Sequence, residues 1–259
     1  MNLRRMRLRL QKSLEQKGAL GTAATLWQKA FRQPAKSLYP PKQYVAVHPF
    51  DQQFGVETSG LLYAEDLPSG SNRDLYNSGY FGIAPSVLCE ILTRLQLHFE
   101  DFTFIDLGSG KGRALLIASQ YPFRSVIGVE LTPKLHEISL SNLAKYGGPQ
   151  RCQDVRSVKG DATEFTFPSG PLVVYLWNSF DGPVFTTVLA NLEASLARDP
   201  REIFILYIEP NLDSVLEGSS SWRKLWRAEF KMSDEDYAAS AFPPLAETCS
   251  AYRSVFPGS

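Results

Sequence analysis

The residues best placed to do chemistry in this chain lie in the stretch FIDLGSGKGR, residues 104–113. An apolar run ends on the acid Asp106, and glycines follow at every second position, at Gly108, Gly110 and Gly112. A glycine loop directly after a buried strand lets the backbone approach a ligand closely. The pattern therefore predicts a loop that holds a nucleotide-containing ligand.

Two familiar phosphate-binding loops do not fit this stretch. The dinucleotide fingerprint G-x-G-x-x-G requires a third glycine where this chain has Arg113. The NTPase loop G-x-x-x-x-G-K-[ST] requires a glycine where Ile105 stands and a hydroxyl side chain where Gly112 stands. The chain also contains no G-x-S-x-G, which excludes the nucleophile elbow of serine hydrolases.

The pattern D-x-G-x-G-x-G fits completely, and Asp106 is its informative residue. A carboxylate would repel a bound pyrophosphate but attract the ammonium and sulfonium groups of S-adenosylmethionine (SAM). The pattern resembles the first motif of class I SAM-dependent methyltransferases, and it is similar to that of the non-SET histone-lysine methyltransferases. The wording from YFGIAPSVLCEIL to VYLWNSF also resembles a little-characterised bacterial branch of this superfamily. The plain alternative is a generic strand–turn–helix with three tolerated glycines.

Two further acids follow at strand ends, in the order that the resemblance implies. Glu130 closes the apolar run SVIGVE, where an acid can accept hydrogen bonds from both ribose hydroxyls. Asp161, in KGDATEF, matches the family's adenine contact, and Ala162 is expected to pack nearby. The plain alternatives are a solvated strand-end acid for Glu130 and a turn or helix cap for Asp161. SAM is therefore the expected cofactor, and no metal is expected.

The segment YLWNSF, residues 175–180, ends the fourth predicted strand. Related enzymes that methylate amines or ring nitrogens often carry N/D-P-P-Y/F at this place. Asn178 and Phe180 match, but both prolines that stiffen that loop are missing. The resemblance implies that Asn178 is catalytic and also contacts the cofactor, and it favours nitrogen over oxygen or carbon as the methylated atom. The alternative is that Asn178 only satisfies loop backbone.

Residues 1–84 are expected to form N-terminal helices and an aromatic cap, and residues 85–259 the SAM-binding methyltransferase domain. The segment 33–85 is rich in proline but too aromatic for a disordered linker. We expect Tyr80 or Phe81 to border the methionine end of SAM, where a ring gains from cation–π attraction. The alternative is that both rings pack into the core.

A regular alternation of apolar strands and amphipathic helices begins at residue 85. It predicts an α/β protein with a doubly wound, mostly parallel, seven-stranded Rossmann-like sheet behind the N-terminal cap. The predicted strands cover residues 102–107, 125–130, 154–158, 171–177, 202–208, 222–230 and 250–256, and the last two form a closing pair joined through the acidic stretch SDEDY. The predicted helices cover residues 1–32, 85–99, 111–121, 132–148 and 182–198.

Composition narrows the function classes. The 259 residues carry a net charge of +0, so no strong nucleic-acid signal exists. The three cysteines lie far apart, and no apolar run could span a bilayer, which together predict a cytoplasmic protein. The N-terminal stretch MNLRRMRLRLQKSLEQKG is basic and amphipathic. It can mark weak membrane-surface contact, a transit peptide, or a helix docked on the domain.

The sequence therefore predicts a SAM-dependent methyltransferase acting on an unidentified acceptor, either a protein or a small molecule. The alternatives are a non-catalytic SAM-fold binding or scaffold protein and, disfavoured by Arg113, a nicotinamide-dependent oxidoreductase. Lys111 and Arg113 begin a helix, and we expect solvated side chains, with contact to the SAM carboxylate as the alternative. Among the histidines, only His48 is a candidate for a functional test, because it lies in the cap beside Pro49 and Phe50.

Overall fold

The chain is described by a computed structural model covering residues 47–62, 67–69, 79–177, 180, 182–240 and 246–255. The predicted N-terminal helix and its basic face lie outside the described residues. So do most of the predicted cap and the residue Asn178. The proposed division after residue 84 stays a prediction, although a helix does begin at Pro85.

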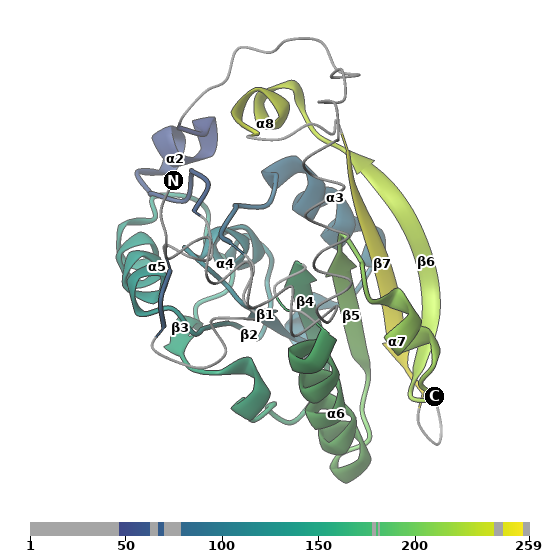
Figure 1. Cartoon of the computed structure of the whole chain (residues 1–259). Helices are drawn as coiled ribbons and strands as arrows, with labels where there is room; N and C mark the ends of the chain where they lie inside the picture. The colour runs from purple at the N-terminus through teal and green to yellow at the C-terminus, as the bar shows by residue number, and fades with distance from the viewer. Residues whose placement is uncertain are drawn as a thin grey trace, which may run out of the picture.

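A seven-stranded sheet forms the centre of the structure (Figure 1). Its order is β3-β2-β1-β4-β5-β7-β6, and β7 is antiparallel to both of its neighbours while the first five strands are parallel. This confirms the predicted doubly wound, mostly parallel, Rossmann-like sheet. The strands are β1 (Thr103–Leu107), β2 (Ser125–Glu130), β3 (Val155–Lys159), β4 (Leu172–Trp177), β5 (Ile203–Ile208), β6 (Trp222–Lys231) and β7 (Ala246–Ser254).

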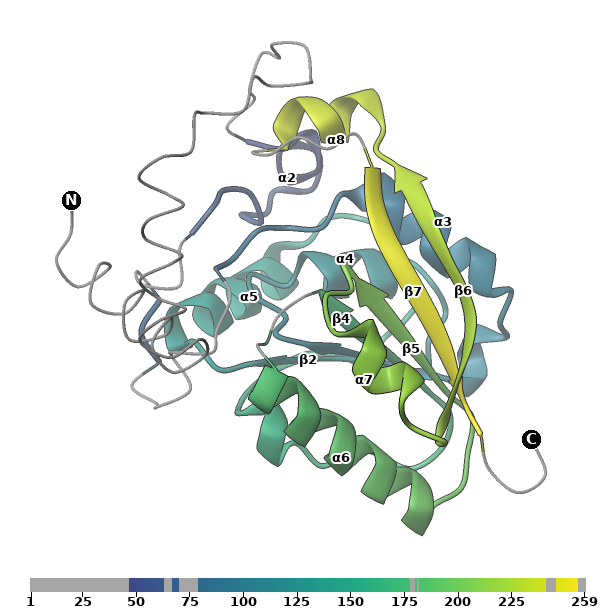
Figure 2. The same ribbon diagram turned by 45° about the vertical axis from the view of Figure 1, so that its right-hand side comes forward.

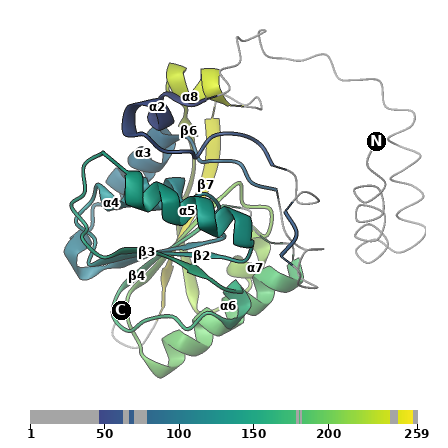
Figure 3. The same ribbon diagram turned by 90° about the vertical axis from the view of Figure 1, so that its left-hand side faces the viewer.

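Helices cover both faces of the sheet. Figure 3 shows α4 and α5 on one side and α6 on the other, and Figure 2 shows β7 and β6 extending the sheet beyond β5. The helices are α2 (Pro49–Phe54), α3 (Pro85–Leu95), α4 (Arg113–Ser119), α5 (Pro133–Lys145), α6 (Gly182–Arg198), α7 (Asp213–Glu217) and α8 (Asp234–Ala239). Short 3₁₀ turns stand at Phe99–Asp101 and Ala162–Glu164.

The central strands are apolar on both faces because each face buries a separate cluster. Phe104 and Tyr175 point into the cluster with α3 and α4, whereas Ile105 and Val174 point into the cluster with α6. Every residue of β1, β2 and β5 is buried. Successive residues of each of these strands therefore point alternately into the two buried clusters, as expected for a parallel sheet that is covered on both faces. The carboxyl ends of β1, β2 and β4 are thereby brought to one edge.

Two expectations about the chain after β5 need correction. The acidic stretch between the closing strands contains the helix α8. Ser233 caps it by accepting a hydrogen bond from the backbone N–H of Asp236 at 3.2 Å, and acids in a first turn favour the helix dipole. Strand β7 begins at Ala246, four residues earlier than predicted, and pairs from its first residue with Lys231. An acid, Glu247, is thereby placed inside the strand.

Candidate functional site

A single cleft at the carboxyl edge of β1, β2 and β4 gathers most of the predicted site. Its side chains surround about 940 Å³ of space, including open solvent at the mouth. Seven of the nine residues predicted to bind the cofactor line it: Tyr80, Asp106, Gly108, Gly110, Glu130, Asp161 and Ala162. Residues far apart in sequence therefore meet where the fold places a ligand.

The loop after β1 depends on its glycines. Gly108, Gly110 and Gly112 have φ values of 85°, 55° and 85°, a region that side chains with a Cβ rarely adopt. A Cβ on Gly110 would stand within 3.0 Å of the ring of Tyr80, so the ring packs directly on the loop. A Cβ on Gly112 would collide with Ser139 of α5 instead. Gly112 precedes α4 and is not among the cleft's lining residues, so its predicted cofactor contact has no support in this geometry.

Glu130 holds the glycine loop from the end of β2. Its two carboxylate oxygens accept hydrogen bonds from the backbone N–H groups of Gly110 and Thr132, each at 2.7 Å. Burial raises the pKa of Glu130, and the hydrogen bonds from Thr132 and Gly110 oppose that shift. An ionised carboxylate oxygen has two acceptor positions, so both oxygens keep capacity for a ribose hydroxyl. Glu130 is buried, and the solvated alternative is wrong.

Asp106 is a buried acid at the edge of the cleft. It is only 3% exposed, and no hydrogen-bond donor reaches its carboxylate within the part of the chain that the structure describes. Burial, and then the nearby charge of Glu130, raise the pKa of Asp106 well above its usual range. A buried acid without a donor favours a ligand that brings a positive charge or an N–H group. Asp106 thus fits the ammonium and sulfonium groups of SAM.

Asp161 performs the capping role that was the plain alternative for it. Its Oδ1 accepts hydrogen bonds from the backbone N–H of Thr163 at 2.8 Å and from the Thr163 hydroxyl at 2.7 Å. The cap begins the 3₁₀ turn Ala162–Glu164. Asp161 and Ala162 nevertheless line the cleft. Their contact with an adenine ring stays a prediction.

Tyr80 and Phe81 both line the cleft. Tyr80 is 7% exposed, and its hydroxyl donates a hydrogen bond to the carbonyl oxygen of Thr58 at 2.6 Å. A two-way backbone bridge with Leu62 fixes the same residue. The Phe81 ring lies 5.6 Å from that of Trp177, which closes β4. The rings therefore wall the cleft rather than filling the core beneath α3, and their contact with SAM stays a prediction.

The expectation that Lys111 and Arg113 are solvated is wrong. Each side chain is about nine-tenths buried or more, with 5% of the residue exposed. Lys111 Nζ donates to a Glu57 carboxylate oxygen at 3.0 Å and to the carbonyl of Ser59 at 2.8 Å. Arg113 donates to the hydroxyl of Thr58 at 2.6 Å and to backbone carbonyls at Gly82 and Ile83. The segment before the sheet supplied these partners, which the sequence pattern did not reveal.

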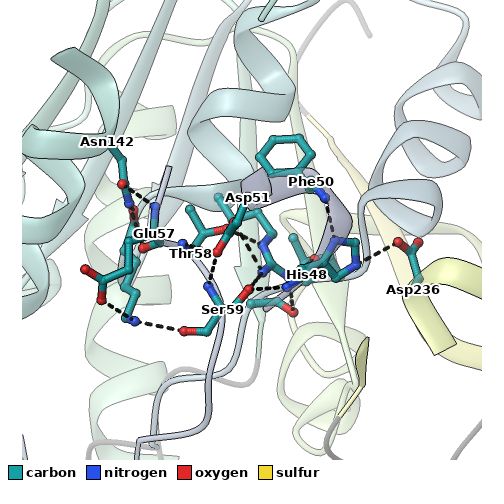
Figure 4. A network of polar contacts seen from close by, with 12 residues as sticks. His48, Phe50, Asp51, Glu57, Thr58, Ser59, Asn142 and Asp236 are labelled. Atoms are coloured by element: carbon teal, nitrogen blue, oxygen red, sulfur yellow. Dashed lines mark hydrogen bonds and ion pairs between the residues drawn. The ribbon is translucent and has the colours of Figure 1, made fainter. Parts of the chain in front are cut away.

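Segment 57–59 is held on the glycine loop by a polar network (Figure 4). Asp51 accepts the backbone N–H groups of Thr58 and Ser59, each at 2.7 Å. Asn142 of α5 accepts the N–H of Glu57 at 2.8 Å and donates to the Glu57 carbonyl at 2.9 Å. Both ends of the segment are thereby fixed, which keeps the cation partners of the loop in place.

His48 has a structural role in the same network. Its Nδ1 accepts the N–H of Phe50 at 3.0 Å and caps α2. Its Nε2 lies 3.0 Å from the Asp236 carboxylate of α8, as Figure 4 shows. The histidine therefore joins α2 to α8. The two contacts engage both ring nitrogens, so a role as a catalytic base has no support in this geometry.

Two residues of interest were missed by the sequence analysis. Tyr175 of β4 stands beside Asp106 in the strand register and lines the cleft. Glu247 of β7 is buried next to the cleft. The signal for Glu247 was a lone acid in the run LAETCSAY, which became readable only once β7 was extended. Within the described residues, no cluster of three or more His, Cys, Asp or Glu side chains is arranged for a metal.

Among the residues that the structure describes, no helix is long and apolar enough to cross a membrane. The strand order with antiparallel β7 is the Rossmann-like arrangement typical of class I SAM-dependent methyltransferases. The sequence resemblance assigned cofactor contacts to the glycine loop after β1 and to the acid that closes β2, and that assignment stays a prediction. The fold and the site therefore define the class to which the chain is structurally similar.

Comparison with solved structures finds members of this class at low sequence identity. A glycopeptide N-methyltransferase in complex with SAM is 14% identical with a TM-score of 0.49, over 69% of this chain and 96% of that chain. A precorrin-6y C5,15-methyltransferase from Geobacter metallireducens is 15% identical with a TM-score of 0.46, over 83% and 100%. The ribosomal protein L11 methylase of Lactobacillus delbrueckii subsp. bulgaricus is 13% identical with a TM-score of 0.45, over 65% and 78%. No known protein-family profile matches the sequence, and no curated protein sequence matches it.

Proposed function

We propose that this protein is a SAM-dependent methyltransferase that acts on a nitrogen nucleophile. The observation that carries the proposal is the cleft in which the acids Asp106 and Glu130 meet the glycine loop. Glu130 is oriented by two backbone N–H groups, and Asp106 lacks a donor among the described residues. A dinucleotide would bring a pyrophosphate against Asp106, whereas SAM brings cationic groups there. Either ligand would offer a ribose to Glu130.

The cleft's residues divide the work of holding the cofactor. Glu130 would accept the ribose hydroxyls, and Asp161 with Ala162 would border the adenine. Asp106 lies at the end of the strand beside the loop backbone, where its carboxylate would compensate positive charge. Tyr80 and Phe81 would cover the methionine end, because both line the cleft. When bound, SAM supplies a methyl group that is already activated on a sulfonium.

The remaining task of the chain is alignment and exclusion of water. An in-line displacement on an activated methyl requires an acceptor atom held close to the methyl and pointed along the breaking bond. The paired rings of Phe81 and Trp177 stand beside the end of β4, where they restrict solvent. Asn178 follows directly after β4, and we assign it the role of orienting the acceptor nitrogen.

The test is a binding and turnover experiment on the full chain. Titration calorimetry should show one site per chain for SAM and for S-adenosylhomocysteine, and no heat with NADH. Incubation of cell extract with methyl-labelled SAM, followed by separation of proteins from small molecules, should then give an enzyme-dependent labelled product. SAM binding without any labelled product would favour the scaffold alternative. Binding of NADH in place of SAM would overturn the proposal.

A further inference from the structure

A second cavity adjoins the cleft on the side of β7. It has room for about one water-sized group, and it shares Phe81, Gly82 and Arg113 with the cleft. The polar residues His48, Ser59, Asp236, Ser240 and Glu247 also line it. We call this space the acidic cavity, defined by His48, Arg113, Asp236 and Glu247. It lies next to the place where a cofactor's reacting end would stand.

Glu247 is the group in the acidic cavity that lacks a partner. It stands near the start of β7, opposite Phe230, and is 4% exposed. Within the described residues, neither of its carboxylate oxygens has a hydrogen-bond partner. The backbone of Ala84, just before α3, faces the carboxylate without reaching hydrogen-bond geometry. A buried carboxylate without a hydrogen-bond partner destabilises the fold. Binding a ligand or a proton would relieve this cost.

The other charged groups of the acidic cavity already have partners. Asp236 accepts the backbone N–H of Ser86 at 2.8 Å and also contacts the Ser86 hydroxyl and His48. Arg113 donates to Thr58 and to backbone carbonyls. No cation is left over there to neutralise Glu247 among the residues that the structure describes. None of these described groups supplies the donor that Glu247 lacks.

Burial raises the pKa of Glu247 to about 8. The charges of Glu209 and Asp236 raise it further, while Ala84 and Arg113 oppose the shift. The titratable and charged groups around it are His48, Arg113, Tyr175, Glu209, Asp236 and Cys249. This pKa favours the neutral form of Glu247 near pH 7, and a cation beside it would favour the ionised form.

Tyr175 connects the acidic cavity to the cleft. The nearby carboxylates of Asp106 and Glu247 both raise its pKa, after the larger effect of burial. Its buried hydroxyl has no hydrogen-bond partner within the described residues. Three oxygen-bearing groups, Asp106, Tyr175 and Glu247, thus lie near one another, from β1 through β4 to β7. Anions are disfavoured beside these groups, and N–H donors are favoured.

We propose that the methyl acceptor is a primary or secondary amine held in the cleft, that its N–H group enters the acidic cavity, and that Glu247 binds this group and takes up its proton. This rests on the proposed function. An amine arrives as an ammonium and cannot attack until it loses a proton. Glu247 accepts that proton, and the freed nitrogen lone pair forms the new N–CH₃ bond. The pair of the broken C–S bond returns to sulfur as a neutral thioether. The methylated product leaves as an ammonium, and Glu247 returns its proton to solvent.

The simplest probe is methylammonium, added to the full chain saturated with S-adenosylhomocysteine. Saturation-transfer NMR should detect its binding to the wild-type chain. Calorimetry in two buffers of different ionisation enthalpy should show proton release at pH 7, because ionised Glu247 is the form that binds. Glu247→Gln should weaken binding at least about 10-fold, since it removes the charge and keeps the shape. Tetramethylammonium, which has charge but no N–H, should not compete.

The matched control is Glu229→Gln on the neighbouring strand β6, because Glu229 is exposed and pairs with Thr248. It should leave methylammonium binding unchanged. If Glu247→Gln does not fold, the pH dependence of the wild-type chain decides. Methylammonium affinity should rise more than about 10-fold between about pH 6 and pH 9, as Glu247 ionises with a pKa of about 8.

Three outcomes would overturn the assignment: no methylammonium binding, equal binding by wild type and Glu247→Gln, or a flat pH profile. Each counts against the acceptor assignment alone, provided that S-adenosylhomocysteine still binds. If S-adenosylhomocysteine itself fails to bind, the proposed function fails first and the acceptor assignment falls with it.

Discussion

The ring of Tyr80 lies directly on Gly110, close enough that a Cβ at position 110 would stand within 3.0 Å of it. The relationship joins the segment before α3 to the glycine loop after β1. Lys111, the next residue of the loop, lies 5.6 Å from the centre of the same ring. The aromatic wall of the cleft and its glycine floor are therefore one packed unit, and changing either should disturb the cofactor site.

Gly110→Ala should abolish or strongly weaken SAM binding. Its φ of 55° is strained for alanine, and the new methyl group would push Tyr80 out of the wall. We expect the free energy of unfolding to fall by roughly 1–3 kcal/mol as well. Calorimetric titration with SAM and thermal denaturation measure the two effects. Gly182→Ala is the matched control, because nothing lies within 4 Å of its added Cβ. Normal SAM binding by Gly110→Ala would contradict the packing described.

Glu130→Ala should weaken SAM binding by about 1–3 kcal/mol, because it removes the acceptor for the ribose hydroxyls and releases the N–H of Gly110. A competing nucleoside with a 2′-deoxyribose tells the two causes apart. The loss of affinity on replacing ribose with 2′-deoxyribose should be smaller in Glu130→Ala than in the wild type. Glu164→Gln serves as control, since Glu164 is exposed and outside the cleft. Unchanged SAM affinity in Glu130→Ala would mean that the ribose lies elsewhere.

Asp106→Asn should stabilise the ligand-free chain while weakening SAM binding. The pKa of Asp106 is raised in the folded state, so folding binds a proton and stability falls as pH rises from the unfolded pKa toward the folded one. Above that window the ionised acid destabilises the fold, and asparagine removes this cost. A rise of about 2–4 °C in the melting temperature at neutral pH corresponds to ~1 kcal/mol. The exposed Asp154→Asn should not shift it. A lower melting temperature for Asp106→Asn would contradict the claim that ionised Asp106 destabilises the ligand-free chain.

Arg113→Lys should destabilise the chain although it keeps the charge. The guanidinium donates to Thr58, Gly82 and Ile83 at once, and one ammonium cannot reach all three. We expect a loss of roughly 2–3 kcal/mol in the free energy of unfolding, since buried acceptors are left unsatisfied. Urea denaturation measures it. Arg124→Lys is the comparison, because Arg124 makes an exposed contact with a single carbonyl. An equal effect of the two changes would contradict the buried network.

Asn178→Ala should lower turnover by about 10- to 100-fold and leave SAM affinity nearly unchanged. An amide that orients the acceptor acts mainly in the transition state, so kcat falls more than binding. The measurement needs an acceptor found in the labelling screen described above. Asn178→Asp keeps the oxygen acceptor and should retain more activity than alanine. If both variants match the wild type, the residue has only a structural role.

The glycine loop and its two acids were readable from the sequence because their spacing reflects local backbone demands. Glycine at alternate positions after an apolar strand predicts positive φ values, and the structure shows them at Gly108, Gly110 and Gly112. The sheet was predictable for a similar reason. Strands buried on both faces leave continuous apolar runs, which β1 and β4 carry.

The partners of charged side chains could not be predicted, because they come from distant segments. Lys111 and Arg113 stand at the start of a helix, and the local sequence predicts that their side chains are exposed to solvent. Packing of segment 57–59 against the loop buries both. No pattern near residue 113 reports these contacts, since 30 to 55 positions separate the partners.

The sequence did not predict the helix α8 or the correct start of β7. Residues 233–239 carry three acids and read as a connector, yet Ser233 and the dipole of a single helical turn favour α8. The start of β7 depended on pairing with β6, which no local signal reports. The sequence by itself determined the class of sheet and the residues of the glycine loop, because those follow from periodicity and backbone conformation. Only the tertiary structure decided which charges are paired and which, like Glu247, have no hydrogen-bond partner among the described residues, because pairing depends on contacts between segments remote in the chain.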